Sequence, residues 1–135
     1  MKVYEICFSP TGGTKKASEM LVKKISGEHV FIDLTDINKE FGSIPMTDGD
    51  VAVIAVPSYG GRVPQVAVDR ISEIKGNGAK AVLLCVYGNR AYEDTLTELE
   101  DSAEKAGFRI IAAVAAIAEH SIARRYASGR PDEKD

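Results

Sequence analysis

The sequence predicts an α/β fold in which a doubly wound parallel sheet of five strands, in the order 2-1-3-4-5, carries helices on both faces. Five short runs rich in Val and Ile alternate with segments whose apolar residues recur at helical spacing. Two of these runs, residues 51–56 (VAVIAV) and 81–86 (AVLLCV), are apolar throughout. Strands buried on both faces have this composition, and such strands are joined by right-handed crossovers.

The predicted elements follow one another in a regular order. The strands span residues 3–8, 29–34, 51–56, 81–86 and 108–114. Residues 35–49 are less regular and predict a loop with one short turn of helix. Three helices are indicated by apolar faces, and each is followed by a glycine that can end it. The face residues are Ala17, Leu21 and Ile25 in the first helix, Ala67, Ile71 and Ile74 in the second, and Tyr92, Leu96, Leu99, Ala103 and Ala106 in the third.

The composition fits a single globular domain over residues 1–135. Hydrophobic residues make up 44% and charged residues 27%, and the net charge of −3 gives no basic surface for nucleic acid. No signal peptide opens the sequence and no apolar run is long enough to span a membrane, so we expect a cytoplasmic protein. Cys7 and Cys85 lie inside apolar runs and are expected to be buried free thiols, too few for an iron–sulfur cluster or a cysteine zinc site.

The C-terminal residues 129–135 (GRPDEKD) predict the start of a helix. Pro131 suits a first helical turn, and Asp132 and Glu133 favour a helix N-terminus. We therefore expect the last helix of the fold to be missing, either because it is absent or because the chain has been cut there, and we favour the cut. A missing helix would expose apolar sheet surface, which favours a homodimer.

The segment after the first strand, SPTGGT, has the features of a phosphate cradle. It leads into a helix whose first backbone N–H groups lack intrahelical partners and carry partial positive charge. Two glycines allow the backbone to approach an anion, and three hydroxyl groups can donate hydrogen bonds. A hydroxyl-rich helix cap is the alternative interpretation. The candidate residues are Ser9, Pro10, Thr11, Gly12, Gly13 and Thr14.

The same segment excludes several other phosphate chemistries. A P-loop places its lysine before the Ser or Thr, whereas here the lysine follows, and the dinucleotide pattern G-x-G-x-x-G is absent. A cysteine phosphatase would need an arginine six residues after Cys7, where Gly13 stands. A receiver domain would need acidic residues after the first strand and at the end of the third. The phosphate is therefore expected to be held, and neither transferred nor hydrolysed.

The loops after the third and fourth strands, PSYGGRVP (57–64) and YGNRAY (87–92), predict walls for a planar ligand. A tyrosine can stack on a ring, and adjacent glycines let the backbone contact it. A glycine turn beside an exposed tyrosine is the alternative, and Tyr92 also fits the apolar face of the next helix. The candidate residues are Ser58, Tyr59, Gly60, Gly61, Tyr87, Gly88, Asn89, Arg90 and Tyr92.

All three loops are expected at one edge of the sheet. In a sheet of this order, ligands bind beyond the carboxyl ends of the strands, where the strand order reverses. A phosphate cradle beside two loops with aromatic residues and glycines fits flavin mononucleotide (FMN). The phosphate would lie in the first loop and the isoalloxazine ring between the other two.

With these loops the chain resembles the flavodoxins. SPTGGT is similar to the family's phosphate-loop pattern Ser/Thr-x-Thr-Gly-x-Thr, and the two later loops match its ring-binding loops in position. PSYGGRVP and YGNRAYEDTLTEL further resemble the N-terminal flavodoxin-like domain of proteins that continue into a 4Fe-4S ferredoxin module.

The resemblance implies non-covalent FMN and electron transfer between redox partners, one of which could be a fused or separate 4Fe-4S ferredoxin. It also implies that Ser9 and residues 11–14 hold the phosphate and that Tyr59 stacks on the flavin. The backbone near Gly60 would contact the flavin N5 in a way that changes with redox state.

The chain also departs from the common flavodoxin pattern. It has no tryptophan, and its binding loops carry Arg62 and Arg90 in place of clustered acids. A cation near the flavin would stabilise the anionic reduced form and raise the reduction potential. We assign no firm role to Arg62 and interpret His120 as structural.

Two alternatives to the electron carrier remain. One is an FMN-dependent NAD(P)H or quinone oxidoreductase, and the other is an interaction module that has lost the flavin. No catalytic base, nucleophile or metal site is evident, and a redox carrier is favoured over a stand-alone enzyme.

Overall fold

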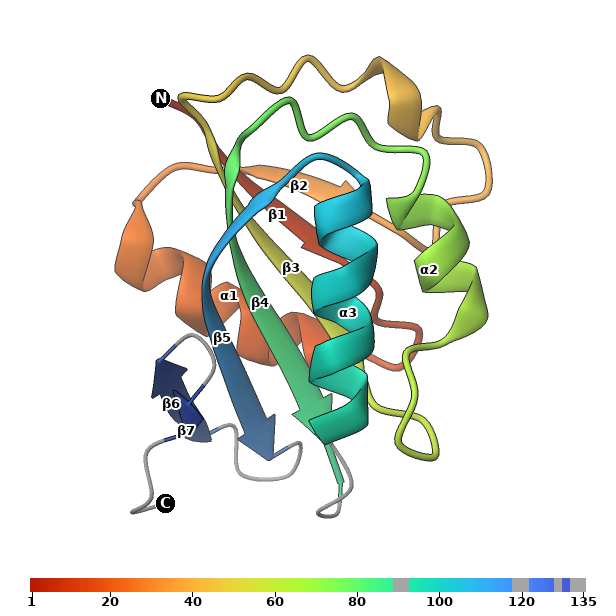
Figure 1. The fold of residues 1–135 in the computed structure, drawn as a ribbon, viewed down its shortest axis with the longest axis vertical. Coiled ribbons are helices and arrows are strands. Elements are labelled where there is room, and N and C mark those ends of the chain that lie inside the picture. Colours follow the sequence, from red (N-terminus) through yellow and green to blue (C-terminus); the bar gives the residue numbers. More distant parts are fainter. Residues whose placement is uncertain (89–92, 118–121, 128–129, 132–135) are drawn as a thin grey trace.

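A computed structural model describes residues 1–88, 93–117, 122–127 and 130–131 (Figure 1). Its sheet has the strand order β2-β1-β3-β4-β5-β6-β7. The first five strands are parallel, which confirms the predicted order 2-1-3-4-5. They are β1 (Val3–Cys7), β2 (Val30–Asp33), β3 (Val51–Pro57), β4 (Lys80–Tyr87) and β5 (Arg109–Ile117).

Beyond β5 the sheet continues with two antiparallel strands that were not predicted. They are β6 (Ile122–Ala127) and β7 (Arg130–Pro131). The expectation that Pro131 opens a helix is therefore wrong. Since β7 is the last strand of the sheet in the part of the chain that the structure describes, Pro131 lies in an outer strand, where a missing N–H is tolerated. Asp132 and Glu133 lie outside the described residues.

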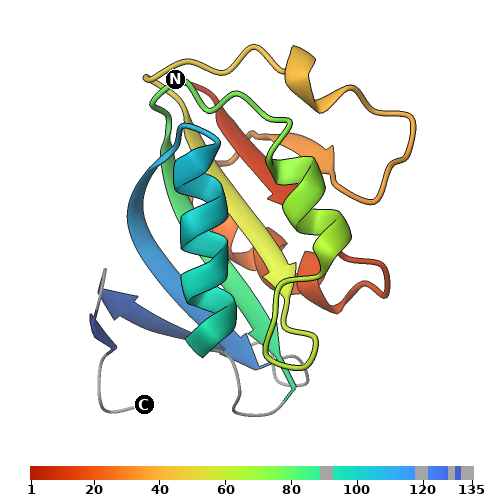
Figure 2. The same ribbon diagram turned by 45° about the vertical axis from the view of Figure 1, so that its right-hand side comes forward.

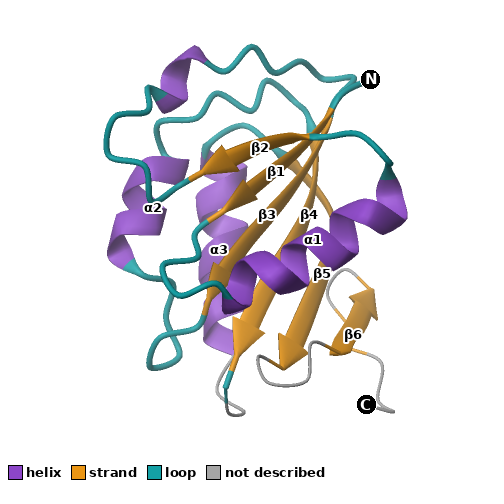
Figure 3. Cartoon of the chain, turned by 180° about the vertical axis from the view of Figure 1, so that it is seen from behind, coloured by secondary structure: helices purple, strands orange, loops and turns teal. Residues whose placement is uncertain are grey.

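The helices cover both faces of the sheet, as predicted. They are α1 (Gly13–Ile25), α2 (Gln65–Ile71) and α3 (Glu93–Lys105), and a 3₁₀ turn, η1 (Phe41–Ser43), lies in the loop after β2. Figures 1 and 3 show α1 on one face and α2 and α3 on the other. Within the described part of the chain, no helix combines the length and the apolar character needed to cross a membrane.

The buried face of α1 differs slightly from the prediction. Its buried residues are Thr14, Ala17, Ser18 and Val22, whereas Ile25 is 37% exposed. The polar residue Ser18 faces the sheet because its hydroxyl donates a hydrogen bond to the buried carboxylate of Glu5 on β1. Sequence patterns that consider only apolar residues miss such a contact.

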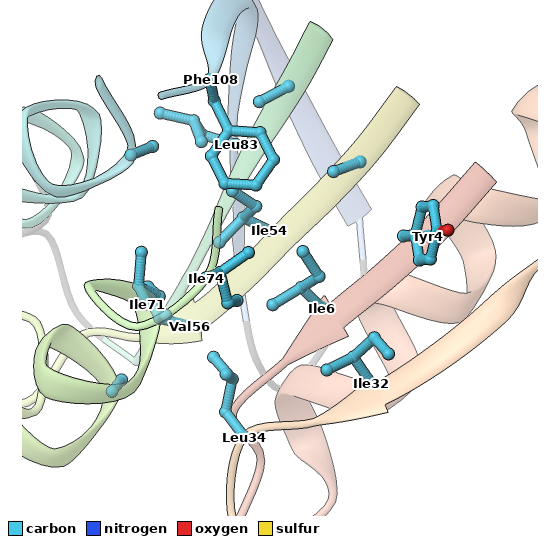
Figure 4. Close-up of a cluster of buried hydrophobic side chains, with 14 of the residues drawn as sticks. Tyr4, Ile6, Ile32, Leu34, Ile54, Val56, Ile71, Ile74, Leu83 and Phe108 are labelled. Carbon is cyan, nitrogen blue, oxygen red and sulfur yellow. The ribbon is translucent and has the colours of Figure 1, made fainter. Parts of the chain in front are cut away.

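The core consists of two apolar layers, one on each face of the sheet. Under α2 and α3, Ile6, Ile54 and Leu83 from the central strands pack with Ile71 and Phe108 (Figure 4). Cys7 belongs to the layer under α1. Cys7 and Cys85 are both free and buried, as predicted. Burial raises the pKa of each thiol to about 12, so both stay protonated.

The amino edge of the sheet is closed by tightly packed glycine turns. The N–H of Gly76 donates to the carbonyl of Ala106 at 2.8 Å, and the N–H of Gly78 donates to the carbonyl of Gly107 at 2.8 Å. A Cβ atom on Gly76 would lie 2.9 Å from the backbone of Gly107 and Phe108. The turn after α2 thus requires glycine because it packs directly on the turn after α3.

Candidate functional site

The loops after β1, β3 and β4 begin side by side at the carboxyl edge. The N–H of Phe8, just after β1, donates to Ala55 of β3 at 3.0 Å. The N–H of Ser58, just after β3, donates to Val86 of β4 at 2.9 Å. The three loops therefore leave adjacent strands, at the point where the strand order reverses, and Figure 2 shows the loop after β3 extending beyond the strand ends.

The first loop is held together by Ser9. The Oγ atom of Ser9 accepts hydrogen bonds from the N–H of Gly12 at 3.1 Å and from the N–H of Lys15 at 2.9 Å. Gly12, with a φ of 95°, lies in the left-handed region that favours glycine and directly precedes α1. Ser9 thus orders the turn from which the helix begins, and its own hydroxyl hydrogen is not used in these two bonds.

The N-terminus of α1 presents unpaired donors to open space. Within the described chain, the N–H groups of Gly13 and Thr14 have no acceptor, and the first turn of α1 contains no acidic residue. A Cβ atom placed on Gly12 or Gly13 would meet no atom within 4 Å. Pro10 and Thr11 are exposed, whereas Thr14 is only 4% exposed. This arrangement suits an anion such as a phosphate group.

The cation nearest in sequence to this loop is engaged elsewhere. The ammonium group of Lys15 pairs with Glu19 one helical turn later and lies 4.1 Å from the ring centroid of Phe31. The hydrogen bond to Glu19 raises the pKa of Lys15. The donors that face the open space are therefore backbone N–H groups, with the lysine turned toward the β2 side of the helix.

The loop after β3 forms a tight hairpin that carries Tyr59. The N–H of Tyr59 donates to Arg62 at 2.9 Å, and the N–H of Arg62 donates back to Tyr59 at 3.0 Å. Gly60 and Gly61 have φ values of 60° and 81°, the combination of a type I′ turn. Tyr59 is 50% exposed, so its ring is available to a ligand.

Two residues of α3 that the sequence analysis missed hold this hairpin. The Oγ atoms of Ser58 and Thr95 lie 2.7 Å apart. Glu98 accepts hydrogen bonds from the guanidinium of Arg62 and from the N–H of Val63. The hydrogen bond from Arg62 lowers the pKa of Glu98. No sequence signal could have found Glu98, because its partner Arg62 lies 36 residues earlier and Glu98 is one of several acidic residues in its segment.

The loop after β4 is described only at its start. Tyr87 is half-buried and Gly88 is exposed, with open space around the position of a Cβ atom. Asn89, Arg90 and Tyr92 lie outside the described residues, as does His120. The second wall of the predicted ring site thus remains a prediction.

A buried carboxylate lies under α1, away from the three loops. Glu5 is fully buried, and its Oε2 accepts the hydrogen bond from Ser18. Its Oε1 lies 2.9 Å from Nε2 of His29, a contact that is an ion pair when the imidazole is protonated. A lone acid within the apolar run VYEIC is a sequence signal that could have drawn attention to this pair. Among the described residues, no three His, Cys, Asp or Glu side chains are grouped so that they could hold a metal ion.

Comparison with known proteins supports the fold. No family model and no curated protein sequence matches the chain. Solved structures do match it. An NADH:FMN oxidoreductase in its apo form has a TM-score of 0.67 at 12% identity, with 88% of this chain and 77% of that chain covered. A Lactobacillus acidophilus flavoprotein in complex with FMN has a TM-score of 0.64 at 13% identity, with 87% and 93% covered.

A third match is the two-electron reduced flavodoxin of Megasphaera elsdenii, with a TM-score of 0.61 at 21% identity, where 85% of this chain and 84% of that chain are covered. The fold is flavodoxin-like. At these identities the comparison establishes the architecture, and the chemistry of the site must be argued from this chain's own residues.

Proposed function

We propose that this chain binds FMN without a covalent bond and carries electrons between redox partners. The observation that carries the proposal is the open space at the start of α1, where a Cβ atom on Gly12 or Gly13 would meet no atom within 4 Å and two N–H groups have no acceptor among the described residues. An exposed tyrosine stands on the hairpin that follows β3, the strand next to β1, at the same edge. A phosphate site beside an aromatic platform suits a flavin nucleotide.

Each loop would have a distinct task. The N–H groups of Gly13 and Thr14 and the hydroxyls of Ser9 and Thr11 would bind the phosphate, since donors at a helix N-terminus favour an anion. Tyr59 would stack on the isoalloxazine ring and exclude water from one of its faces. Tyr87 and Gly88, with the residues that follow them, would form the second wall.

When bound, the flavin supplies the electron-transfer chemistry. The protein's residues bind and orient it. The peptide between Gly60 and Gly61 can turn over at little steric cost, because both residues are glycine, and it can thereby present either its carbonyl or its N–H to the ring. No residue of this chain need act as a base or nucleophile.

The partner proposal rests on the sequence resemblance described above. An iron–sulfur protein of the 4Fe-4S ferredoxin type, fused or separate, would accept or supply the electrons. An FMN-dependent NAD(P)H or quinone oxidoreductase is the second candidate, because an NADH:FMN oxidoreductase is among the similar structures. Steady oxidation of NADH or NADPH by the FMN-loaded protein, with oxygen or a quinone as acceptor, would favour the enzyme over the carrier.

The decisive test is an FMN titration of the purified protein, followed by absorbance and flavin fluorescence. We expect saturation at about one FMN per chain, with a shifted spectrum and quenched fluorescence from stacking on Tyr59. Gly13→Asp should weaken binding by about 100-fold or more, because it adds a negative charge where two or three charge-assisted hydrogen bonds would form.

We expect Gly13→Asp to leave the fold intact, since an acidic residue at a helix N-terminus is stabilising. Gly27→Asp is the matched control: it adds the same charge just beyond the other end of α1, where there is also open space. FMN binding that is equally strong in both variants, or no binding by the unmodified protein, would overturn the proposal.

A further inference from the structure

The Tyr59 hairpin is tied to α3 on both sides. Before the hairpin, the hydroxyl of Ser58 is bonded to that of Thr95, which is fully buried. After it, Arg62 and Val63 are bonded to Glu98. Thr95 and Glu98 are three residues apart, so they lie on one face of the helix. Between the two ties only residues 59–61 remain, and Gly60 has open space around it.

The carboxylate of Glu98 accepts three hydrogen bonds. Oε2 accepts from Nη2 of Arg62 at 2.8 Å, while Oε1 accepts from Nε of Arg62 at 3.2 Å and from the N–H of Val63 at 2.8 Å. A bidentate pair between a guanidinium and a carboxylate fixes the orientation of the guanidinium plane as well as its position. The side chain of Arg62 is 69% exposed, and exposed ion pairs add little to stability. The pair therefore matters for placement more than for folding energy.

We propose that Glu98 is a positioning residue of the FMN site, an inference that rests on the proposed function. Glu98 fixes the hairpin that carries Tyr59 and compensates the charge of Arg62 at the edge of the site. Because its guanidinium is paired with a carboxylate, Arg62 is expected to raise the flavin potential less than an unpaired cation would. The Gly60–Gly61 peptide is then the one part of the hairpin left to adjust to the flavin.

Removing either charge tests this pairing, because the two substitutions should shift the preference for reduced over oxidised FMN in opposite directions. Without Glu98, Arg62 is uncompensated and favours the extra negative charge of reduced FMN. Without Arg62, the carboxylate of Glu98 disfavours it. A unit charge about 10 Å away, at an effective dielectric constant between 20 and 80, changes the ratio of the dissociation constants for oxidised and reduced FMN by about two- to fifteen-fold.

The experiment measures the dissociation constants of oxidised and chemically reduced FMN for Glu98→Gln, Arg62→Gln, the double variant and Glu100→Gln. Glu98→Gln keeps an oxygen that can accept from Val63 but loses the charge. Glu100→Gln removes the same charge from an exposed position of the same helix. We expect Glu98→Gln to favour reduced FMN, Arg62→Gln to disfavour it, and the other two to resemble the unmodified protein. Equal shifts in Glu98→Gln and Glu100→Gln would overturn the compensation.

A second measurement needs no flavin. Amide hydrogen exchange of the protein without FMN should be at least about tenfold faster at Val63 in Glu98→Ala, because this N–H loses its acceptor. Glu100→Ala should leave it unchanged, and unchanged exchange in Glu98→Ala would overturn the positioning role. If the unmodified protein binds no FMN, the proposed function fails, while the exchange rates still decide whether Glu98 holds the hairpin.

Discussion

Gly76 and Gly78 at the amino edge of the sheet differ from the loop glycines at its carboxyl edge in how much space the protein leaves around them. At the amino edge a Cβ atom on Gly76 would clash with backbone at 2.9 Å, and one on Gly78 would lie 3.2 Å from Asp48. At the carboxyl edge a Cβ atom placed on Gly12, Gly13 or Gly60 would meet no atom within 4 Å. Gly76 and Gly78 serve packing, whereas Gly12, Gly13 and Gly60 have open space beside them.

The backbone donors differ in the same way. At the amino edge, Gly76 and Gly78 donate to carbonyls of the neighbouring turn at 2.8 Å. At the carboxyl edge, the described chain offers no acceptor to Gly13 or Thr14. Glycine content alone therefore does not indicate a ligand site. Unfilled space together with unpaired donors does, and the following substitutions test that distinction.

The largest effect is expected from Gly76→Ala. The new methyl group would press on the backbone of Gly107 and Phe108, which cannot rotate away, so we expect a loss of about 3 kcal/mol in the free energy of unfolding. Urea denaturation monitored by circular dichroism measures this loss. FMN affinity, measured in urea-free buffer, should be unchanged.

Gly13→Ala is the matched control at the carboxyl edge. Its methyl group enters open space at the start of a helix, so stability should stay equal or rise by about 0.5–1 kcal/mol. If Gly76→Ala and Gly13→Ala have the same effect on stability, the contrast between the two edges is wrong.

A smaller effect is expected from Asp50, which organises the amino edge. Its carboxylate accepts from the N–H of Lys2 at 2.9 Å and from the N–H of Thr47 at 2.8 Å, and these bonds lower its pKa. The stabilisation is present above the unfolded pKa of about 4 and is lost as the pH falls through the lower folded pKa. Asp50→Asn should lower stability by about 1–2 kcal/mol at neutral pH.

In Asp50→Asn the free energy of unfolding should also fall less steeply as the pH is lowered than in the unmodified protein. Urea midpoints measured from pH 7 down to pH 2 would show this, with Asp48→Asn as a control at an exposed neighbouring carboxylate. An acid limb that is steeper in Asp50→Asn than in the unmodified protein would contradict the assignment.

The smallest effect on folding is expected from Tyr59→Ala. Because Tyr59 is half exposed and projects from a hairpin, its removal should change stability by less than about 0.5 kcal/mol. FMN affinity should fall by about tenfold, and the quenching of flavin fluorescence should decrease. Tyr59→Phe serves as the control, because it keeps the ring and should keep both properties.

The parts of the molecule that sequence predicted best are those with local signals. The strands at residues 51–56 and 81–86 are apolar because both faces are covered, and the glycine-rich loops follow the strand ends directly. Their alternation with helices predicted a parallel sheet, and the doubly wound order 2-1-3-4-5 suited five strands. The location of three loops at one edge was then a consequence of topology.

Features that depend on distant pairs were not predictable. The contact of Glu98 with Arg62 joins a helix to a loop, and Ser18 replaces an apolar residue on α1 only because Glu5 faces it from β1. β7 was missed because Pro131 followed by acids resembles a helix start, and no element was predicted for the residues of β6. That pattern gave no indication of an outer antiparallel strand.

The double hydrogen bond accepted by Ser9 has a consequence for the kinetics of ligand capture. Its two bonds close the loop before any ligand arrives, so the turn does not have to be ordered during association. Ordering one backbone residue costs roughly 1–2 kcal/mol of free energy through lost conformational entropy. A loop that is already ordered avoids this cost when the ligand binds. Ser9→Ala should thus leave the empty protein folded while slowing productive encounters, since only a fraction of loop conformers would be ready to accept a phosphate.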